Sequence, residues 1–223
     1  MLNKSGLLYI ICFTLVFTNI GCGNTNKTSA DIPNPTATIV STPSNSENQP
    51  NKIKFKTETG SELFSLKLQT DGAKLVDAKN NEIVKIKSEQ SGKIKIKNAS
   101  DKELGYIVRE IGSWKLENSE QNKTLYILKL ENNGNYKLED SANKEVYKIN
   151  ATNNELLIQT NNKIVYKVKI KEQKTSLRDA SGKTVFSTKS NMSPIAFACF
   201  GFDVLTREQQ AALAYAVNLT GGK

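Results

Sequence analysis

The chain has 223 residues and a net charge of +9, and only three of its 31 basic residues are arginine. Lysine is a solvated point charge, so this composition favours non-specific attraction to anionic surfaces or polymers over specific nucleic-acid recognition. Histidine is absent, which excludes Ser-His-Asp and Cys-His nucleophilic sites and removes the commonest transition-metal ligand. Cys12, Cys22 and Cys199 form no CxxC pair, so we expect neither a zinc site nor another cofactor.

The N-terminus predicts an exported protein. Lys4 precedes an apolar run from Leu7 to Phe17, which is typical of a signal peptide and short for a bilayer span. The Ile-Gly-Cys sequence ending at Cys22 resembles the processing box of bacterial lipoproteins, although Asn19 stands where that family usually has Leu. The resemblance implies that residues 1–21 are removed and that Cys22 carries the lipid. An ordinary secretory signal, with Cys22 a bystander, is the alternative.

Residues 22–52 are rich in Asn, Ser, Thr and Pro, and they contain four of the five prolines. A segment with so few large apolar residues cannot bury enough surface to fold, so we expect a flexible tether. Together with the lipid at Cys22, the tether predicts a cell-envelope location, anchored to a membrane. Partners are then expected among anionic lipids or envelope proteins.

From residue 53 onward, apolar residues alternate with lysine, most clearly in 93–98 and 164–172. A period of two with one apolar face predicts half-buried antiparallel strands. We interpret the lysines as a solvated outer face that also discourages edge-to-edge aggregation. About twelve candidate strands suit a closed barrel or a sandwich better than a single open sheet.

Three segments share a turn pattern, with Leu, then Asp two residues later, then Asn or Gly three residues after the Asp. They are 75–85, 138–148 and 177–187. The Asp can accept hydrogen bonds within its own turn, and the Asn or Gly suits a left-handed residue followed by a bulge. We therefore interpret the three aspartates as turn residues and not as catalytic carboxylates; they are Asp77, Asp140 and Asp179. Asn153-Asn154 and Asn161-Asn162 predict two-residue turns.

After the signal, the C-terminal region is the most apolar part of the chain. Residues 193–200 predict a strand buried on both faces, in which Cys199 is a small core residue. Residues 205–219 predict a helix that begins with a capping box of Thr206 and Gln209. Because this helix is apolar nearly all round, we expect it to pass through the barrel and form its core.

A strand meander closed around a C-terminal apolar helix resembles the tubby-like superfamily, which includes LURP-one-related proteins and phospholipid scramblases. The resemblance covers residues 53–223 and implies a membrane-proximal, non-enzymatic role; it supplies no binding residues. Two other folds remain open, a β-sandwich and a lipocalin-like open barrel with an external helix. The expected function is a membrane-anchored, non-enzymatic lipoprotein that binds a partner or an anionic lipid surface. A lipocalin-like carrier of a small apolar ligand is the alternative, and an enzyme using carboxylates is disfavoured.

Overall fold

A computed structural model describes residues 51–152 and 154–222. These residues form fourteen strands and a helical C-terminal segment. The strands are β1 (Lys52–Lys56), β2 (Glu62–Gln69), β3 (Gly72–Asp77), β4 (Glu82–Ser88), β5 (Ile94–Asn98), β6 (Glu103–Glu110), β7 (Ser113–Glu117), β8 (Thr124–Leu130), β9 (Tyr136–Asp140), β10 (Glu145–Ala151), β11 (Glu155–Thr160), β12 (Lys163–Lys171), β13 (Lys174–Asp179) and β14 (Thr184–Thr188).

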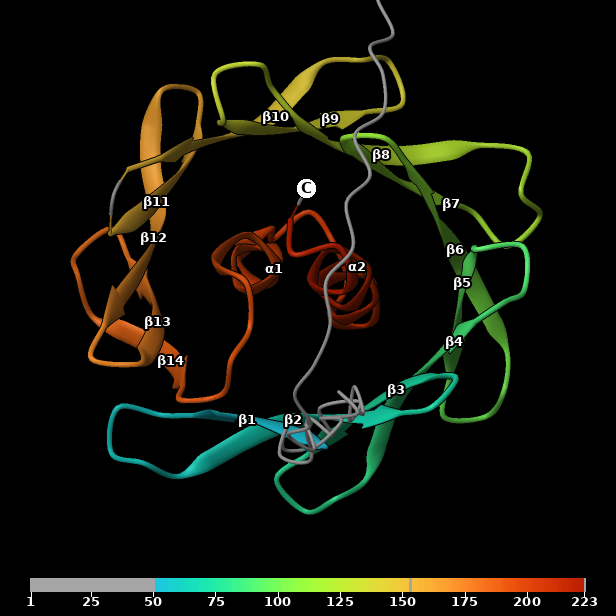
Figure 1. Ribbon diagram of the computed structural model, residues 1–223, viewed down its shortest axis with the longest axis horizontal. Helices are drawn as coiled ribbons and strands as arrows, with labels where there is room; N and C mark the ends of the chain where they lie inside the picture. Colours follow the sequence, from blue (N-terminus) through green and yellow to red (C-terminus); the bar gives the residue numbers. More distant parts are fainter. Residues whose placement is uncertain (1–50, 153, 223) are drawn as a thin grey trace, which may run out of the picture. The chain divides into compact units, whose positions relative to one another are not determined.

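Each strand pairs antiparallel with the next, and β14 returns to β1, so that the sheet is a closed barrel (Figure 1). The predicted barrel and meander are confirmed, and the count of about twelve strands is corrected to fourteen. Alternation indicates strands but does not fix where one strand ends and the next begins, so the number of strands follows from the pairing in the structure.

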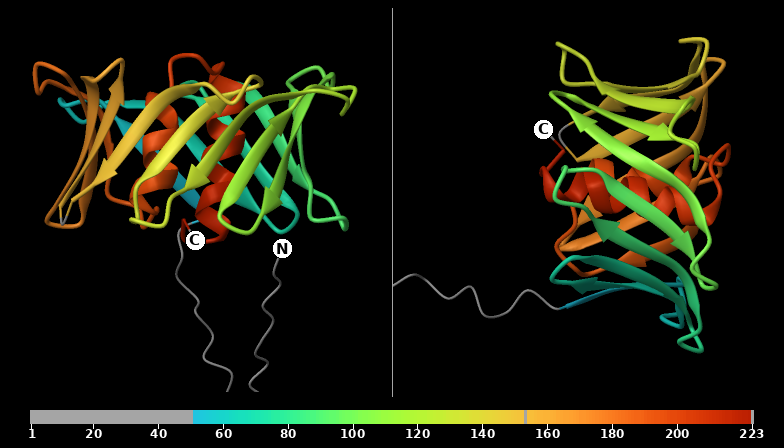
Figure 2. Two further views of the ribbon diagram at one scale, coloured as in Figure 1. Left: turned by 90° about the horizontal axis from the view of Figure 1, so that it is seen from above. Right: turned by 90° about the vertical axis from the view of Figure 1, so that its right-hand side faces the viewer.

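The barrel interior holds α1 (Pro194–Ala198), the 3-10 turn η1 (Cys199–Gly201) and α2 (Arg207–Leu219), as Figures 1 and 2 show. The threaded helix is therefore confirmed, and the sandwich and the external-helix barrel are wrong. The strand predicted at 193–200 is also wrong, because Ser193 caps a helix there and Pro194 occupies its first turn. An apolar run of this length cannot by its pattern alone distinguish a buried strand from a buried helix.

The helix α2 begins as predicted, with the capping box of Thr206 and Gln209. Its residues from Gln210 to Val217 are all buried, which is the burial expected for a helix that is apolar on every side. It packs against α1 and against the inner faces of β3 to β7, while α1 packs against β11, β12 and β13. The four alanines of α2 keep it thin enough to share the interior with a second helix.

The predicted turns are confirmed. Seven loops share one pattern, in which the first residue's N–H donates to the fifth residue's carbonyl and the fourth residue's N–H donates to the first residue's carbonyl. Their fourth residues are left-handed, as expected for a type I turn followed by a bulge. The loops are 57–61, 77–81, 89–93, 98–102, 131–135, 140–144 and 179–183. Asn161 and Asn162 form a two-residue turn with positive φ angles of 49° and 61°, whereas Asn153 lies outside the described residues.

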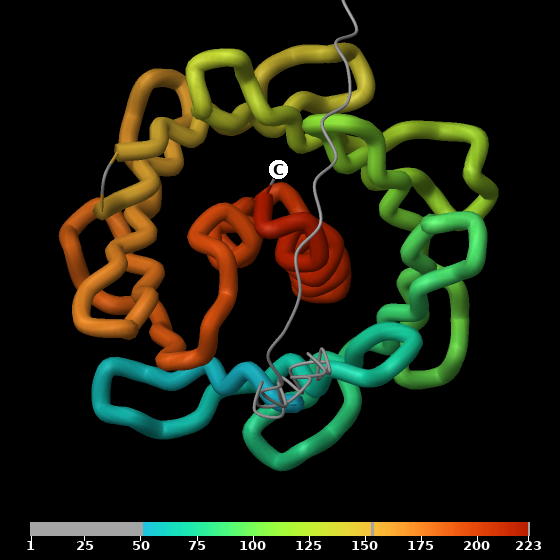
Figure 3. The backbone as a smooth tube through the Cα atoms, in the orientation of Figure 1, coloured from blue at the N-terminus to red at the C-terminus, as the bar shows by residue number. Residues whose placement is uncertain are grey.

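The two ends of the barrel differ. We call the end at which β1 begins and α2 finishes the terminal end; there the hydroxyl of Tyr136 donates to the carbonyl of Gly222 at 2.6 Å. The smooth trace in Figure 3 shows the C-terminal segment entering the ring from the end of β14. Because the strands form a meander, the loops that begin with Asp77, Asp140 and Asp179 all lie at the opposite end.

Candidate anion-binding groove

The barrel wall is weakest where β14 meets β1, which we call the seam. Only one residue pair, Lys56 opposite Ser187, joins these strands, whereas every other neighbouring pair of strands is matched at four or more positions. After Thr188 the chain leaves the wall and reaches α1 at Pro194. The remaining length of β1 therefore faces the seam with no paired strand beside it.

Phenylalanine packing closes the seam from inside. Phe55 of β1 stacks on Phe64 of β2 with ring centroids 4.5 Å apart, and it contacts Phe200 of η1 at 4.9 Å. Phe186 of β14 meets Phe64 edge-on, with ring centroids 5.3 Å apart. Phe197 of α1 packs on Phe55 of β1 and on Phe186 of β14. Such aromatic pairs add about 0.5–1.5 kcal/mol each beyond the area they bury. Side chains thus hold a junction that the backbone ladder barely spans.

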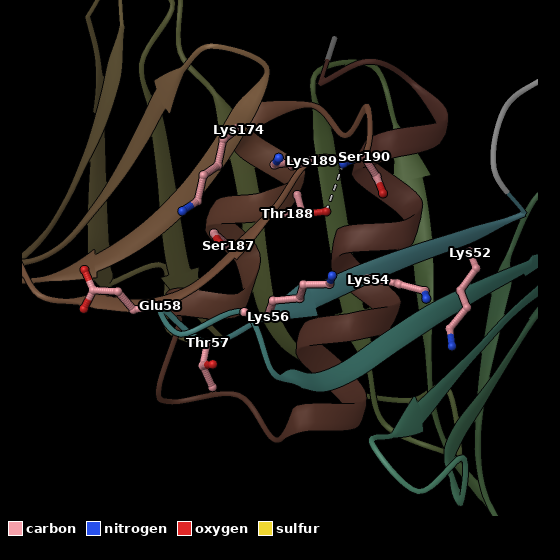
Figure 4. A pocket seen from close by; sticks show the side chains of 11 residues that line it. Lys52, Lys54, Lys56, Thr57, Glu58, Lys174, Ser187, Thr188, Lys189 and Ser190 are labelled. Atoms are coloured by element: carbon pink, nitrogen blue, oxygen red, sulfur yellow. Dashed lines mark hydrogen bonds between the residues drawn. The ribbon is translucent and has the colours of Figure 1, made fainter.

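A groove of about 500 Å³ runs along the outside of this seam (Figure 4). The side chains of Lys52, Lys54 and Lys56 line it from β1. Lys174 lines it from β13, and Lys189 follows the end of β14. Period-two alternation explains the β1 side, because Ile53 and Phe55 point into the core and leave the three lysines outside.

The groove carries a net positive charge, because one carboxylate, that of Glu58, lines it beside five lysines. Glu62 pairs with Lys52 at 3.0 Å and with Lys54 at 3.5 Å. The hydrogen bond from Lys52 is the main cause that holds the pKa of Glu62 below its usual value. By contrast, Lys56, Lys174 and Lys189 have no carboxylate within 4 Å among residues 51–152 and 154–222. These last three ammonium groups are available to an anion.

Hydroxyl groups lie beneath these lysines. Ser187 and Thr188 of β14 line the groove and are buried, and Ser176 and Thr175 lie opposite them on β13. The hydroxyl of Thr188 accepts a hydrogen bond from the backbone N–H of Ser190 at 3.1 Å. Serine and threonine hydroxyls can also donate, so Ser187 and Thr188 add neutral hydrogen-bond donors to the lysines of the groove.

The positive surface continues beyond the groove. A neighbouring hollow of about 590 Å³ shares Lys174 and Lys189 with it and adds Lys169, Lys171 and Arg178. Within this hollow Lys171 pairs with Glu172 at 3.4 Å, whereas the guanidinium of Arg178 donates to backbone oxygen in its own hairpin. Both hollows can attract an anion electrostatically.

The aspartates noted in the sequence are turn residues, as predicted. The Oδ1 atom of Asp140 accepts from the N–H groups of Ala142 and Lys144 at 2.9 and 3.0 Å, and Asp77 makes both corresponding bonds. Asp179 accepts from the N–H of Lys183 and from the hydroxyl of Ser181. Each carboxylate is used by a separate hairpin. The structure does not bring them together into one catalytic site.

The predictions for cysteine have different outcomes. Cys199 is fully buried in η1, its thiol donates to the carbonyl of Ile195 at 3.3 Å, and burial raises its pKa far above the usual value. The predicted core role is therefore confirmed. Cys22, the predicted lipid attachment site, lies outside the described residues.

The described part of the chain offers no metal site and no membrane-spanning helix. In that part no group of three or more His, Cys, Asp or Glu side chains is placed to hold a metal ion. Neither of its helices is long and apolar enough to cross a membrane.

Sequence reasoning missed the groove. The Lys-Ile-Lys-Phe-Lys stretch of β1 showed that three lysines share one face, but their approach to Lys174 and Lys189 depends on closure of the barrel. Comparison with protein family models, with characterised proteins and with solved structures finds no match for this chain.

Proposed function

We propose that this protein is a membrane-anchored, non-enzymatic lipoprotein of the bacterial cell envelope whose barrel binds anionic lipid headgroups in the groove at the seam. The observation that carries the proposal is that Lys56, Lys174 and Lys189 line one groove and have no carboxylate partners within 4 Å in the described structure. Lysine attracts phosphate groups at a membrane surface as a point charge and needs no fixed geometry.

The position of the groove supports this function. The predicted tether from Cys22 ends at β1, and β1 supplies one side of the groove. A lipid at Cys22 would hold the barrel near the membrane, where an electrostatic contact between the groove and anionic headgroups adds to the attraction. The tubby-like resemblance, which implies a membrane-proximal role, agrees with this arrangement.

The alternative function, a carrier of a small apolar ligand, draws no support from the barrel interior. In a lipocalin-like carrier the ligand lies inside the barrel. Here α1 and α2 occupy the interior, and their residues pack against the inward side chains of the wall. The lysine groove lies on the outside and is not an apolar pocket.

The test is binding of residues 22–223 carrying Cys22→Ala, which lack the predicted signal peptide, to vesicles of phosphatidylcholine with and without phosphatidylglycerol. We expect salt-sensitive binding to the anionic vesicles alone. Replacing Lys56, Lys174 and Lys189 by Gln should weaken it by roughly a hundredfold, since each lysine near an anionic surface contributes about 1 kcal/mol. The matched control replaces three exposed lysines in loops that do not line the groove, Lys79, Lys123 and Lys144. Equal binding to neutral vesicles, or an equal loss in the control, would contradict the proposal.

Anchoring is tested separately in cells. The Cys22→Ala change should release the protein from the membrane fraction or block its maturation. A variant that fractionates and migrates like the parent chain would show that Cys22 carries no lipid.

A further inference from the structure

The strand register places five lysines in one continuous row on the outer face of the barrel. Each lysine stands directly opposite the next on the neighbouring strand: Lys52 on β1, Lys67 on β2, Lys74 on β3, Lys85 on β4 and Lys97 on β5. We call this set the lysine row. Neighbouring strands lie about 4.8 Å apart, so the row crosses about 19 Å of the wall.

This arrangement is unfavourable for the isolated protein. Like charges directly opposite each other on paired strands destabilise a sheet. The five side chains are also half-buried, so that water solvates them less fully than it solvates lysines at loop tips. The row therefore places positive charges at neighbouring positions, where they repel one another.

Carboxylates compensate only part of the row. Glu82 contacts Lys74 at 2.9 Å and Lys85 at 3.4 Å, and Asp101 contacts Lys85 at 2.9 Å. Lys67 and Lys97 have no carboxylate within 4 Å in the described part of the chain. Two of the five ammonium groups thus remain for an external anion.

Another part of the wall shows how the protein neutralises such a row. Lys129 on β8 stands opposite Lys137 on β9, and Glu139 bridges both at 2.5 and 2.8 Å. The Glu139 side chain is only 7% exposed, so this bridge is part of the packed wall. No equivalent carboxylate among the described residues bridges Lys67 to its neighbours.

The lysine row begins in the groove at the seam, because Lys52 belongs to both. From there it follows β1 to β5, five of the fourteen strands around the ring (Figure 1). A flat membrane can touch a convex wall only along a narrow strip, whereas a flexible linear molecule can follow the curve. The row therefore fits a chain of anionic groups better than it fits a lipid surface.

We propose that a linear polyanion with repeated phosphate groups lies across β1 to β5 along the lysine row, with one end in the groove at the seam. This inference rests on the proposed function to the extent that the same groove accepts phosphate. It adds a second class of ligand, and it states that this polymer runs perpendicular to the strands. Neutralisation by such a polymer would also relieve the repulsion within the row.

Inorganic polyphosphate of graded chain length, compared with orthophosphate, is the probe. Titrated into residues 22–223 carrying Cys22→Ala, polyphosphate should bind more tightly as the polymer lengthens, until the polymer spans the row. The slope of log affinity against log salt should fall by about 1.5 when Lys67 and Lys97 are both replaced by Gln, since each phosphate contact releases close to one counterion. The matched control, Lys79→Gln with Lys123→Gln, should leave the slope unchanged.

The outcomes separate the two proposals. An unchanged slope in the Lys67 and Lys97 variant, or an affinity independent of polymer length, overturns the row. Binding to anionic vesicles by that same variant, compared with the groove variant that lacks Lys56, Lys174 and Lys189, decides the proposed function independently. Circular dichroism and thermal unfolding of each variant verify that the barrel is intact, and replacing only Lys67 gives a milder variant if the double change unfolds it.

Discussion

Two neighbouring strand pairs of the barrel, β2 with β3 and β14 with β1, are held together in different ways. The first pair is matched at six positions along a regular ladder, and the second at one. At the seam, packing of Phe55, Phe186 and Phe197 takes the place of backbone hydrogen bonds. Closure of this barrel thus depends on side chains from the C-terminal segment as well as on strand pairing.

The difference follows from the path of the chain. To place α1 and α2 inside the ring, the chain must leave the wall after Thr188 and turn inward. Its departure leaves one edge of β1 without a neighbour and opens the groove. The same step that fills the core therefore creates the surface to which we assign anion binding.

Deleting residues 205–223 should have the largest effect. The loss removes α2, whose residues from Gln210 to Val217 are all buried, and leaves the inner faces of β3 to β7 without a partner. Domains are commonly stable by only about 5–15 kcal/mol, so we expect the loss of this central helix to abolish the cooperative unfolding transition. A truncated chain with a barrel-like circular dichroism spectrum and a sharp thermal transition would contradict this account of the core.

Replacing Phe55 by Ala should test the seam itself. We expect a loss of about 3–5 kcal/mol in the free energy of unfolding, measured by urea titration, because a fully buried ring leaves a cavity. Leu128→Ala is the matched control in a wall with a full ladder. Only Phe55→Ala should also accelerate proteolysis near β1 and β14; equal acceleration in both variants would mean that the seam is no weaker than the rest of the wall.

Asp140→Ala should have a smaller effect, because the hairpin between β9 and β10 does not line the groove. The variant loses two hydrogen bonds to backbone N–H groups, and we expect about 1 kcal/mol of destabilisation in urea. Vesicle binding should not change, because the residue serves only its own turn. Loss of binding with intact folding would give the aspartates the functional role that their geometry argues against.

Glu62 should give the smallest effect on stability and a measurable effect on binding. Its pKa is lowered in the folded protein, so its contribution to stability is present above its ordinary pKa and is lost as the pH falls through the lowered value. Glu62→Gln should reproduce at neutral pH the release of Lys52 and Lys54 that acid causes. We expect a several-fold gain in affinity for anionic vesicles. The free energy of unfolding should also fall less steeply on acidification than it does in the parent protein. Weaker vesicle binding would contradict the assignment of the groove.

Much of this fold could be predicted from local sequence patterns. Alternation identified the strands, the positions of Asp77 and Asn80 identified the turn type, and Thr206 with Gln209 marked the start of α2. These features depend on residues close together in the chain, and the structure confirms them. The 193–200 segment failed because its apolar run has no period, and only Ser193 and Pro194 indicate a helix there.

The candidate site could not be predicted in the same way. The sequence predicts a solvated face for the alternating lysines. It does not show which lysines on neighbouring strands stand opposite one another. Register and closure decide that, and both depend on contacts between distant residues. Lys56 and Lys189 belong to the first and last parts of the barrel, and only the completed ring brings them into one groove.

Hydrogen exchange of backbone amides, with and without polyphosphate, tests the central claim most directly. In the free protein the amides of Lys52 and Lys54 should exchange much faster than those of β2 and β3, because β1 has an unpaired edge there. Added polyphosphate should slow exchange at the seam and along the outer face of β1 to β5, and leave β8 to β10 unchanged. Slow exchange at the seam in the free protein, or protection by polyphosphate confined to other strands, would contradict both the open seam and the ligand that we assign to it.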